Sequence, residues 1–167
     1  MTKATGCQPT ASVIVALALL AAGRAHACWE EAAARYGVSS ELLYAIARTE
    51  SDMNPAAIGR NRDGSRDLGL MKINSTWLPA LAPRGIGERE LLEPCTNIQV
   101  AAWILAGNVQ RLGYTWDAVG AYHTASPPLR RAYAERVYRQ FVGARPPGRT
   151  SRDRVPSTAS PVTAARP

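Results

Sequence analysis

Apolar residues recur every three or four positions in several stretches of the chain, and this spacing predicts a domain built mainly from α-helices. The most regular stretch, residues 96–112, predicts a buried central helix that ends at Gly113. Residues 39–51 form a second pattern, which begins at a capping serine and ends before the Asn54-Pro55 pair. Shorter patterns predict helices over residues 29–36, 74–78, 116–123 and 127–142.

The last predicted helix opens with the Ser126-Pro127 pair, a cap followed by a proline at the first helical position. Its apolar residues stand four positions apart, and we expect them to form one stripe that faces the core: Leu129, Tyr133, Val137 and Phe141. Residues 143–167 are rich in Pro, Arg, Ser and Thr and lack periodicity, which predicts a disordered basic tail.

A turn-rich region follows the 39–51 helix. The Asp63-Gly64 pair stands between Ile58 and Leu68, which predicts a small β-hairpin beside that helix. Asn74 or Ser75 can cap the next short helix. We expect Pro79 to end it and the chain to be irregular from there to Pro94.

Glu50 lies in the last turn of the 39–51 helix. At helical spacing it shares a face with Leu43, Ile46 and Ala47, so the pattern places its carboxyl group at the edge of the core. Burial disfavours the ionised form and raises the pKa, and a carboxyl group that stays protonated near neutral pH suits general-acid catalysis. From this helix alone, a glutamate that points outward at the rim is the alternative.

Residues 1–27 have the features of a secretory signal peptide. Lys3 precedes an uncharged apolar run over residues 11–22, and residues 25–27 form a small-x-small cleavage pattern. The run has 12 residues, which is shorter than the ~20 that span a bilayer. We therefore expect export to the periplasm, a mature domain over residues 28–142, and no stable membrane insertion after cleavage.

The three cysteines agree with export. Cys7 lies in the predicted signal peptide, and Cys28 and Cys95 remain as an even pair. An oxidising compartment favours one disulfide between them; two unpaired thiols, or a lipid on Cys28, are the alternatives. A two-cysteine metal site lacks further ligands, because His26 leaves with the signal peptide and His123 stands alone, so we expect no metal.

The net charge of +7 lies mostly outside the predicted domain. Residues 1–27 carry +2 and residues 143–167 carry +4, which leaves +1 for residues 28–142. A nearly neutral domain gives no electrostatic basis for a nucleic-acid interface, so we expect no nucleic-acid partner.

Several motifs occur in a distinctive order: Glu50-Ser51, Asn61, Gly64-Ser65, Asp67-Leu68-Gly69-Leu70-Met71-Lys72-Ile73-Asn74, Pro94-Cys95-Thr96-Asn97, Trp116 and Ala121-Tyr122. This series resembles the lytic transglycosylases of the lysozyme-like superfamily, above all the small enzymes that accompany type III and type IV secretion and conjugation systems. The resemblance covers about residues 28–125 and implies a lysozyme-like α+β domain with a small β-hairpin. It also implies a monomer without a cofactor that acts on peptidoglycan glycan strands, with proteins of a secretion or conjugation apparatus as candidate partners.

The resemblance implies roles for individual residues. Glu50 would be the single catalytic acid and base, and Cys28 and Cys95 match the family's disulfide. The implied substrate-binding residues are those of the wall and the sugar cleft: Ser51, Gly69, Leu70, Met71, Lys72, Ile73, Asn74, Tyr122 and His123. Lys72 stands where the family has Gln, and His123 where it has Asn, which changes hydrogen bonding to the saccharide rather than the chemistry.

Most glycosidases use two carboxylates across the scissile bond. Near Glu50 the chain offers Asp52, which at i+2 on a helix faces another way, and Asp67, which we expect to accept backbone N–H groups. The resemblance implies that the N-acetyl group of the substrate replaces the second carboxylate, and that a 1,6-anhydro end forms. A hydrolytic lysozyme and a non-catalytic peptidoglycan-binding adaptor are the alternatives.

Overall fold

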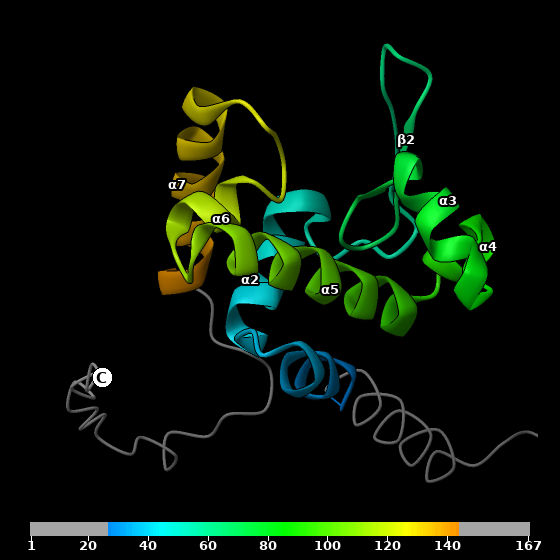
Figure 1. Cartoon of the computed structure of the whole chain (residues 1–167), viewed down its shortest axis with the longest axis horizontal. Coiled ribbons are helices and arrows are strands. Elements are labelled where there is room, and N and C mark those ends of the chain that lie inside the picture. The colour runs from blue at the N-terminus through cyan, green and yellow to red at the C-terminus, as the bar shows by residue number, and fades with distance from the viewer. Residues whose placement is uncertain (1–26, 144–167) are drawn as a thin grey trace, which may run out of the picture.

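The computed structural model describes residues 27–143; all but the last residue of the predicted signal peptide and all but the first residue of the predicted tail lie outside this range. Helices surround one long central helix, α5, with α6 and α7 at one end and α3 and α4 at the other (Figure 1). A small sheet stands beside them, which confirms the predicted mainly α, lysozyme-like α+β fold. In chain order the elements are a helix over residues 27–36, α2 (Ser40–Ser51), β1 (Ile58–Arg60), β2 (Arg66–Leu68), β3 (Ile73–Asn74), η1 (Ser75–Trp77), α3 (Leu78–Leu81), η2 (Ala82–Arg84), α4 (Glu88–Leu91), α5 (Pro94–Leu112), α6 (Trp116–Gly120) and α7 (Pro127–Gly143).

Helix α2 begins and ends where its sequence predicts. The Ser39 hydroxyl accepts a hydrogen bond of 3.0 Å from the backbone N–H of Leu42, so Ser39 is the N-cap. Asp52 ends the helix in a left-handed conformation with φ 49°. One side of α2 is fully buried in the core: Leu42, Leu43, Ala45, Ile46 and Ala47. Helix α2 packs mainly against α7 and also against α5.

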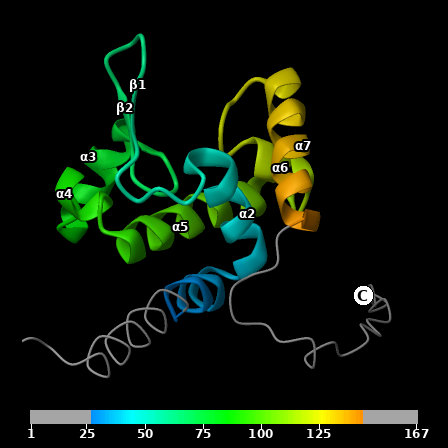
Figure 2. The same cartoon turned by 180° about the vertical axis from the view of Figure 1, so that it is seen from behind.

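The predicted hairpin is present and gains a third strand. β1 pairs with β2 in antiparallel register, with Ile58 opposite Leu68, and β2 pairs with β3, with Asp67 opposite Asn74. The strand order is β1-β2-β3, and Figure 2 shows the β1–β2 hairpin projecting away from the helices. The turn between β2 and β3 is held to the end of α2, because the Ser51 hydroxyl donates to the backbone oxygen of Leu70.

The prediction of an irregular segment from Pro79 to Pro94 is wrong. Helices α3 and α4 and the 3-10 turn η2 occupy most of this segment, and Leu81 and Leu91 are buried in the core. Pro79 lies in the first turn of α3, where its missing N–H is not needed for a helical hydrogen bond. The proline therefore starts a helix instead of ending one.

The predicted disulfide joins the first described helix to the start of α5. Cys28 and Cys95 are bonded, with their Cα atoms 5.3 Å apart. The sulfur of Cys28 is thus occupied, which removes the thiol that a lipid would need. Helix α5 is the predicted central helix and is buried along most of its length, at Asn97, Ile98, Val100, Ala101, Ala102, Ile104, Leu105 and Asn108. Within residues 27–143, no helix is long and apolar enough to cross a membrane.

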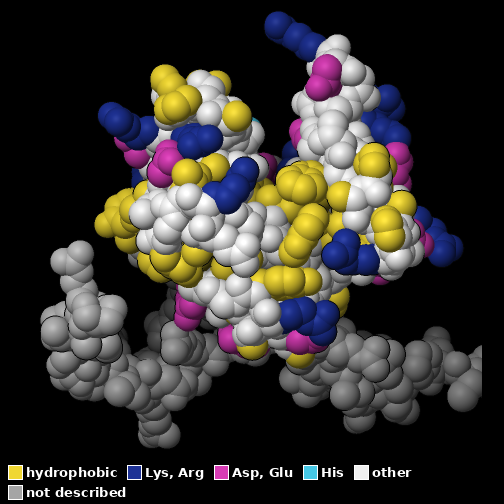
Figure 3. Space-filling model, in the orientation of Figure 1, with side chains coloured by type: hydrophobic (Ala, Val, Ile, Leu, Met, Phe, Trp, Pro, Cys, Tyr) yellow, Lys and Arg dark blue, Asp and Glu magenta, His cyan; other side chains and the backbone are white. Residues whose placement is uncertain are grey.

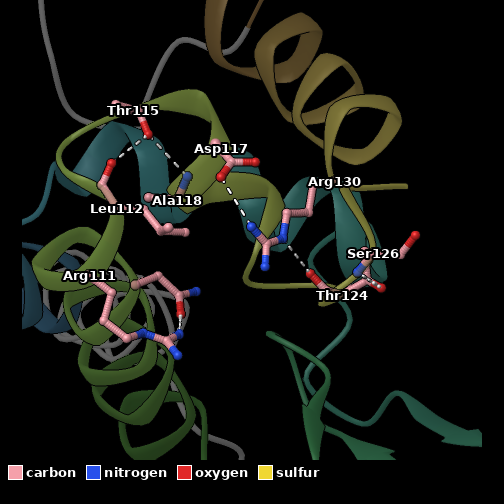
Figure 4. Close-up of polar contacts among 9 residues, drawn as sticks. Arg111, Leu112, Thr115, Asp117, Ala118, Thr124, Ser126 and Arg130 are labelled. Carbon is pink, nitrogen blue, oxygen red and sulfur yellow. Dashed lines mark hydrogen bonds and ion pairs between the residues drawn. The ribbon is translucent and has the colours of Figure 1, made fainter. Parts of the chain in front are cut away.

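Helices α6 and α7 pack against each other with unusually close backbones. A Cβ atom on Gly120 would lie 2.5 Å from the backbone oxygen of Arg130, so only glycine fits at this crossing. The Arg130 guanidinium donates to the carboxylate of Asp117 in α6 and to the backbone oxygen of Thr124, both at 3.1 Å (Figure 4). Arg130 therefore fixes the loop after His123 to both helices.

Helix α6 is shorter than predicted, because it ends at Gly120 and the chain continues as turns to His123. In α7 the predicted four-residue stripe is only half correct. Tyr133 and Val137 are buried, but Leu129 is 58% exposed and Phe141 is 37% exposed. Four residues exceed one helical turn by about 40°, so a four-residue repeat rotates away from the core over three steps.

Candidate active site

A polar cleft separates the sheet from the lobe formed by α6 and α7, and the molecule is visibly hollowed there (Figure 3). The cleft has a volume of about 200 Å³. Residues that are far apart in the sequence line it: Glu50, Asn61, Asp67, Lys72, Ile73, Asn74, Trp77, Ile104, Tyr122 and His123. Six predicted site residues are therefore together: Glu50, Lys72, Ile73, Asn74, Tyr122 and His123.

Glu50 is half-buried at the carboxyl-terminal end of α2. Its Oε1 atom accepts a hydrogen bond of 2.6 Å from the hydroxyl group of Tyr133 in α7. Burial raises the pKa of Glu50 above its usual range; the Tyr133 hydrogen bond and the Lys72 charge oppose this rise, and the Asp67 charge adds to it. The carboxyl group is thus biased towards the protonated form and also has a donor that can stabilise its ionised form.

Asp67 is the second carboxylate among the described residues that line the cleft. Its Oδ1 atom accepts side-chain amide hydrogens from Asn61 at 3.2 Å and from Asn74 at 2.8 Å. We predicted an acceptor of backbone N–H groups, and the structure shows an acceptor of asparagine amides instead. These two bonds tie β2 to β3 and to the β1–β2 turn, so Asp67 shapes the wall of the cleft opposite Glu50.

The Lys72 side chain enters the cleft from a left-handed backbone position and passes close to Gly59. The Lys72 backbone is left-handed with φ 51°, and its side chain crosses Gly59 so closely that a Cβ atom there would lie 2.5 Å from the Lys72 Nζ atom. Glycine at position 59 therefore leaves room for the ammonium group. Its positive charge counteracts the rise in the pKa of Glu50.

The loop after α6 supplies the far side of the cleft. The Tyr122 hydroxyl donates a hydrogen bond of 2.9 Å to the backbone oxygen of Met71. The His123 ring stacks on the Tyr133 ring, with centroids 4.7 Å apart and planes within 2°. Burial, helped by the Arg136 charge, lowers the pKa of His123, so the imidazole is biased towards its neutral form.

Four of the predicted substrate-binding residues do not line the cleft: Ser51, Gly69, Leu70 and Met71. Leu70 and Met71 are buried in the core. The Ser51 hydroxyl donates to the backbone oxygen of Leu70 at 2.7 Å, which holds the turn against α2. These residues form the layer behind the cleft and position its lining residues.

Asn97 supports that layer from α5 and is completely buried. Its Oδ1 atom accepts from the Met71 N–H at 2.6 Å, and its Nδ2 atom donates to the backbone oxygens of Leu68 and Leu91 at 3.0 and 2.6 Å. Gly69 allows this approach, since a Cβ atom there would lie 2.7 Å from Nδ2. One amide thus satisfies three backbone groups of the 68–71 turn and α4.

Sequence reasoning missed Tyr133 as a partner of Glu50, and it did not place Asn61 and Ile104 in the cleft. Tyr133 was assigned to the core stripe of α7, which is where it lies, but a buried tyrosine hydroxyl needs a hydrogen-bond partner. That need was the available signal. Trp77 also lines the cleft and is 37% exposed.

A helical domain with a small antiparallel sheet, and a half-buried glutamic acid in the cleft between them, is the arrangement of a lysozyme-like domain. The comparisons with known proteins are more specific. The chain belongs to the transglycosylase SLT domain family, whose model matches residues 27–140. This is a family of lytic transglycosylases, so the chain has a peptidoglycan-acting role of that type.

Several curated relatives resemble most of the chain. Invasion protein IagB of Salmonella typhimurium (strain SL1344) is 45% identical over 134 residues, which cover 77% of this chain and 84% of the relative. Protein IpgF of Shigella flexneri is 38% identical over 125 residues, covering 72% and 82%. A peptidoglycan-binding-like protein of Escherichia coli O157:H7 is 38% identical over 124 residues, covering 67% and 74%.

Proposed function

We propose that the protein is a peptidoglycan lytic transglycosylase that cleaves the β-1,4 bond between MurNAc and GlcNAc and forms a 1,6-anhydroMurNAc end. The observation that carries the proposal is the state of Glu50, a half-buried acid with a raised pKa inside a polar cleft. The other cleft carboxylate, Asp67, is engaged by two asparagine amides in the sheet. This arrangement favours chemistry with one catalytic carboxyl group.

In the first step, the protonated Glu50 donates its proton to the glycosidic oxygen as the C1–O bond breaks, and the bonding electrons leave with the GlcNAc oxygen. The carbonyl oxygen of the substrate's own N-acetyl group meets the positive charge that develops at C1. In the second step, the Glu50 carboxylate takes the proton of the C6 hydroxyl group while O6 bonds to C1. Glu50 ends protonated again, and no water is consumed.

Tyr133 suits both steps. Its hydroxyl group donates to Glu50 Oε1, so it stabilises the carboxylate that exists between the first and second proton transfer. Because Tyr133 belongs to α7 and Glu50 to α2, the packing of these two helices sets the geometry of the acid. Asn74, Lys72, Tyr122 and His123 supply polar groups that we expect to contact the sugars.

We also propose that the protein is exported to the periplasm, where it opens the wall locally for a secretion or conjugation apparatus. The apolar run and cleavage pattern of residues 1–27 support export. The disulfide agrees with an oxidising compartment. Among the relatives, one is named an invasion protein and another a peptidoglycan-binding-like protein, which supports work at the cell envelope.

Digestion of purified sacculi, followed by mass spectrometry of the released muropeptides, tests the reaction. We expect products one water lighter than hydrolysed muropeptides. The Glu50→Gln variant should lose on the order of 10²- to 10⁴-fold in rate or more, while it still binds sacculi. Asp52→Asn is the matched control, because it changes an exposed acid two residues away that already has a left-handed backbone.

The alternatives give different results. Reducing ends of full mass would identify a hydrolytic lysozyme, with water in place of the C6 hydroxyl group. Wild-type protein that binds sacculi and releases nothing would identify a binding adaptor. Equal activity of the Glu50→Gln variant and the wild type would refute the role of Glu50.

A further inference from the structure

The lobe formed by α6 and α7 exposes large apolar side chains that take no part in the cleft. We call this set the aromatic patch: Tyr114, Trp116, Tyr138, Phe141 and Val142. Tyr138 is 50% exposed and Val142 is 62% exposed, which is high for side chains of this size and polarity. Most of the large hydrophobic side chains exposed between residues 27 and 143 belong to this patch.

The patch is an ordered surface. The Trp116 ring packs edge to face against Tyr138, with centroids 5.2 Å apart, and against Phe141 at 6.0 Å. A depression of about 900 Å³ adjoins these rings, and its walls include Arg131, Ala134 and Arg139 of α7. Aromatic rings that already pack on one another lose little conformational entropy when a ligand covers them.

The patch and the cleft lie on different sides of α7. Tyr133 and Val137 are buried on the side of α7 that packs within the domain, where Tyr133 meets Glu50. Tyr138 projects from the helix about 140° away from Tyr133, given five helical steps of about 100°. A ligand on the patch therefore leaves the cleft open.

The charge of the chain is concentrated at the same end. Residues 116–167 carry a net charge of +6, whereas residues 28–115 carry −1. Arg131 and Arg139 stand in the depression beside the aromatic rings, together with Asp117, which pairs with Arg130, and Glu135. Residues 116–143 carry a net charge of +2, and residues 144–167, which follow α7 directly in the sequence, contain five arginines and one aspartate. In Figure 3 basic and hydrophobic side chains lie side by side on this lobe. The patch thus matches a partner that is anionic and has an apolar layer.

We propose that the aromatic patch docks the protein on an anionic phospholipid surface. Trp and Tyr side chains are enriched at the level of lipid headgroups, and clustered arginines next to them add attraction to anionic lipids. Each contribution is weak alone, and stable peripheral binding takes two such signals, which this end of the chain combines.

A bilayer fits the charge pattern better than an acidic protein segment does. Glu135 lies between Arg131 and Arg139, one helical turn from each. A rigid acidic partner with carboxylates opposite both arginines would also place negative charge near Glu135. Mixed lipid headgroups can rearrange so that anionic lipids gather at the arginines and zwitterionic lipids at the glutamate.

Vesicle cosedimentation of the purified mature chain tests the proposal. Vesicles of equal parts phosphatidylethanolamine and phosphatidylglycerol should bind the protein at low salt, and vesicles of phosphatidylcholine alone should not. The double variant Tyr138→Ser/Val142→Ser should weaken binding by on the order of tenfold. Ile58→Ser is the matched control, because Ile58 is 54% exposed on β1, outside the patch.

The charge contribution is tested separately. The double variant Arg131→Gln/Arg139→Gln should weaken binding by on the order of 20- to 30-fold, since one basic residue near an anionic surface contributes about a fivefold change in affinity. Arg62→Gln/Arg89→Gln is the matched control, with two exposed arginines removed outside the lobe. Both patch variants should digest sacculi like the wild type, which shows that they fold.

Three results would overturn the proposal. Wild-type protein that does not bind anionic vesicles at low salt excludes a lipid surface. Binding that is unchanged in both patch variants, but lost when the five arginines of residues 144–167 are replaced by glutamine, assigns adsorption to that segment alone. Patch-dependent binding to a soluble acidic amphipathic Leu/Glu helix, without vesicle binding, assigns the surface to a protein partner.

Discussion

Replacing Tyr133 with phenylalanine isolates one oxygen atom beside the candidate catalytic acid. The substitution removes the hydroxyl group that donates to Glu50 Oε1 at 2.6 Å. The ring itself, which is 1% exposed and stacks on His123 at 4.7 Å, is retained, so no cavity forms. The change therefore tests the hydrogen bond without disturbing the packing of α7.

The expected magnitude depends on the charge of Glu50. A hydrogen bond between neutral groups contributes about 0.5–1.5 kcal/mol to stability, and one to a charged group contributes about 1.5–3 kcal/mol. Tyr133→Phe should thus lower the free energy of unfolding by about 1 kcal/mol more when Glu50 is ionised than when it is neutral. The same difference acts on catalysis, because Glu50 becomes a carboxylate in the first step. We expect the maximal rate to fall on the order of fivefold.

The direction in which the pH profile of activity shifts follows from the effect of Tyr133 on the pKa of Glu50. The hydroxyl group of Tyr133 lowers the pKa of Glu50, so its removal leaves burial less opposed and raises that pKa further. Glu50 must be protonated to start the reaction, so the alkaline limb of the activity profile should move to higher pH. Sacculus digestion across pH, and urea unfolding at about pH 4 and at about pH 8, measure both effects.

Two tyrosines of the same region serve as controls. Tyr138→Phe removes an exposed hydroxyl group from the same helix and should change neither stability nor rate. Tyr122→Phe removes a hydroxyl group that donates to the Met71 backbone oxygen, so it should lower stability by a similar amount at both pH values. If Tyr133→Phe destabilises equally at both pH values and leaves the alkaline limb in place, the hydroxyl group does not act on the Glu50 charge.

Further predictions concern stability. Because the pKa of Glu50 is raised in the folded chain, the free energy of unfolding should fall as the pH rises from the usual glutamate pKa to the folded pKa of Glu50. Glu50→Gln should therefore be more stable than the wild type above this pH range and equally stable below it, and urea unfolding at several pH values will measure the difference. Asn97→Ala leaves three buried backbone groups without a partner and should cost about 3 kcal/mol or more, and a loss under 1 kcal/mol in urea unfolding would contradict the buried network. Replacing Cys28 and Cys95 with alanine opens a link between residues 67 positions apart and should cost about 4 kcal/mol, while wild type treated with reductant should unfold at the same urea concentration as the variant.

Local chemistry explains which parts of the fold follow from the sequence. The Ser39 cap, the Asp63-Gly64 turn and the Asn74 cap each act within a few residues, and the structure confirms all three. Pro79 misled the prediction because proline can begin a helix as readily as end one, and the buried leucines of α3 and α4 decide between the two. Such tertiary contacts are not visible in a local pattern.

The candidate site also depends on contacts that a local sequence pattern does not show, here between residues far apart in the chain. The helical face of Glu50 correctly placed its carboxyl group at the edge of the core. Its hydrogen-bond donor comes from a residue 83 positions later, and no local spacing indicates that contact. Likewise, the 69–71 turn was predicted as a cleft wall, but the buried amide of Asn97 draws its backbone inward and leaves the neighbouring residues to face the cleft.

These contacts make the α6–α7 lobe part of the acid's environment. Glu50 belongs to α2, yet the group that stabilises its ionised form belongs to α7, and Arg130 fixes α7 to the loop that carries Tyr122 and His123. A displacement of α7 by a fraction of an ångström would lengthen the Tyr133 hydrogen bond, and a lengthened bond would leave burial to raise the pKa of Glu50 further. The close crossing at Gly120 opposes such a displacement, because the backbone of α6 already lies directly against Arg130 of α7 there. The lobe therefore acts on the reaction through the position of one hydroxyl group, and its rigidity matters as much as the residues that line the cleft.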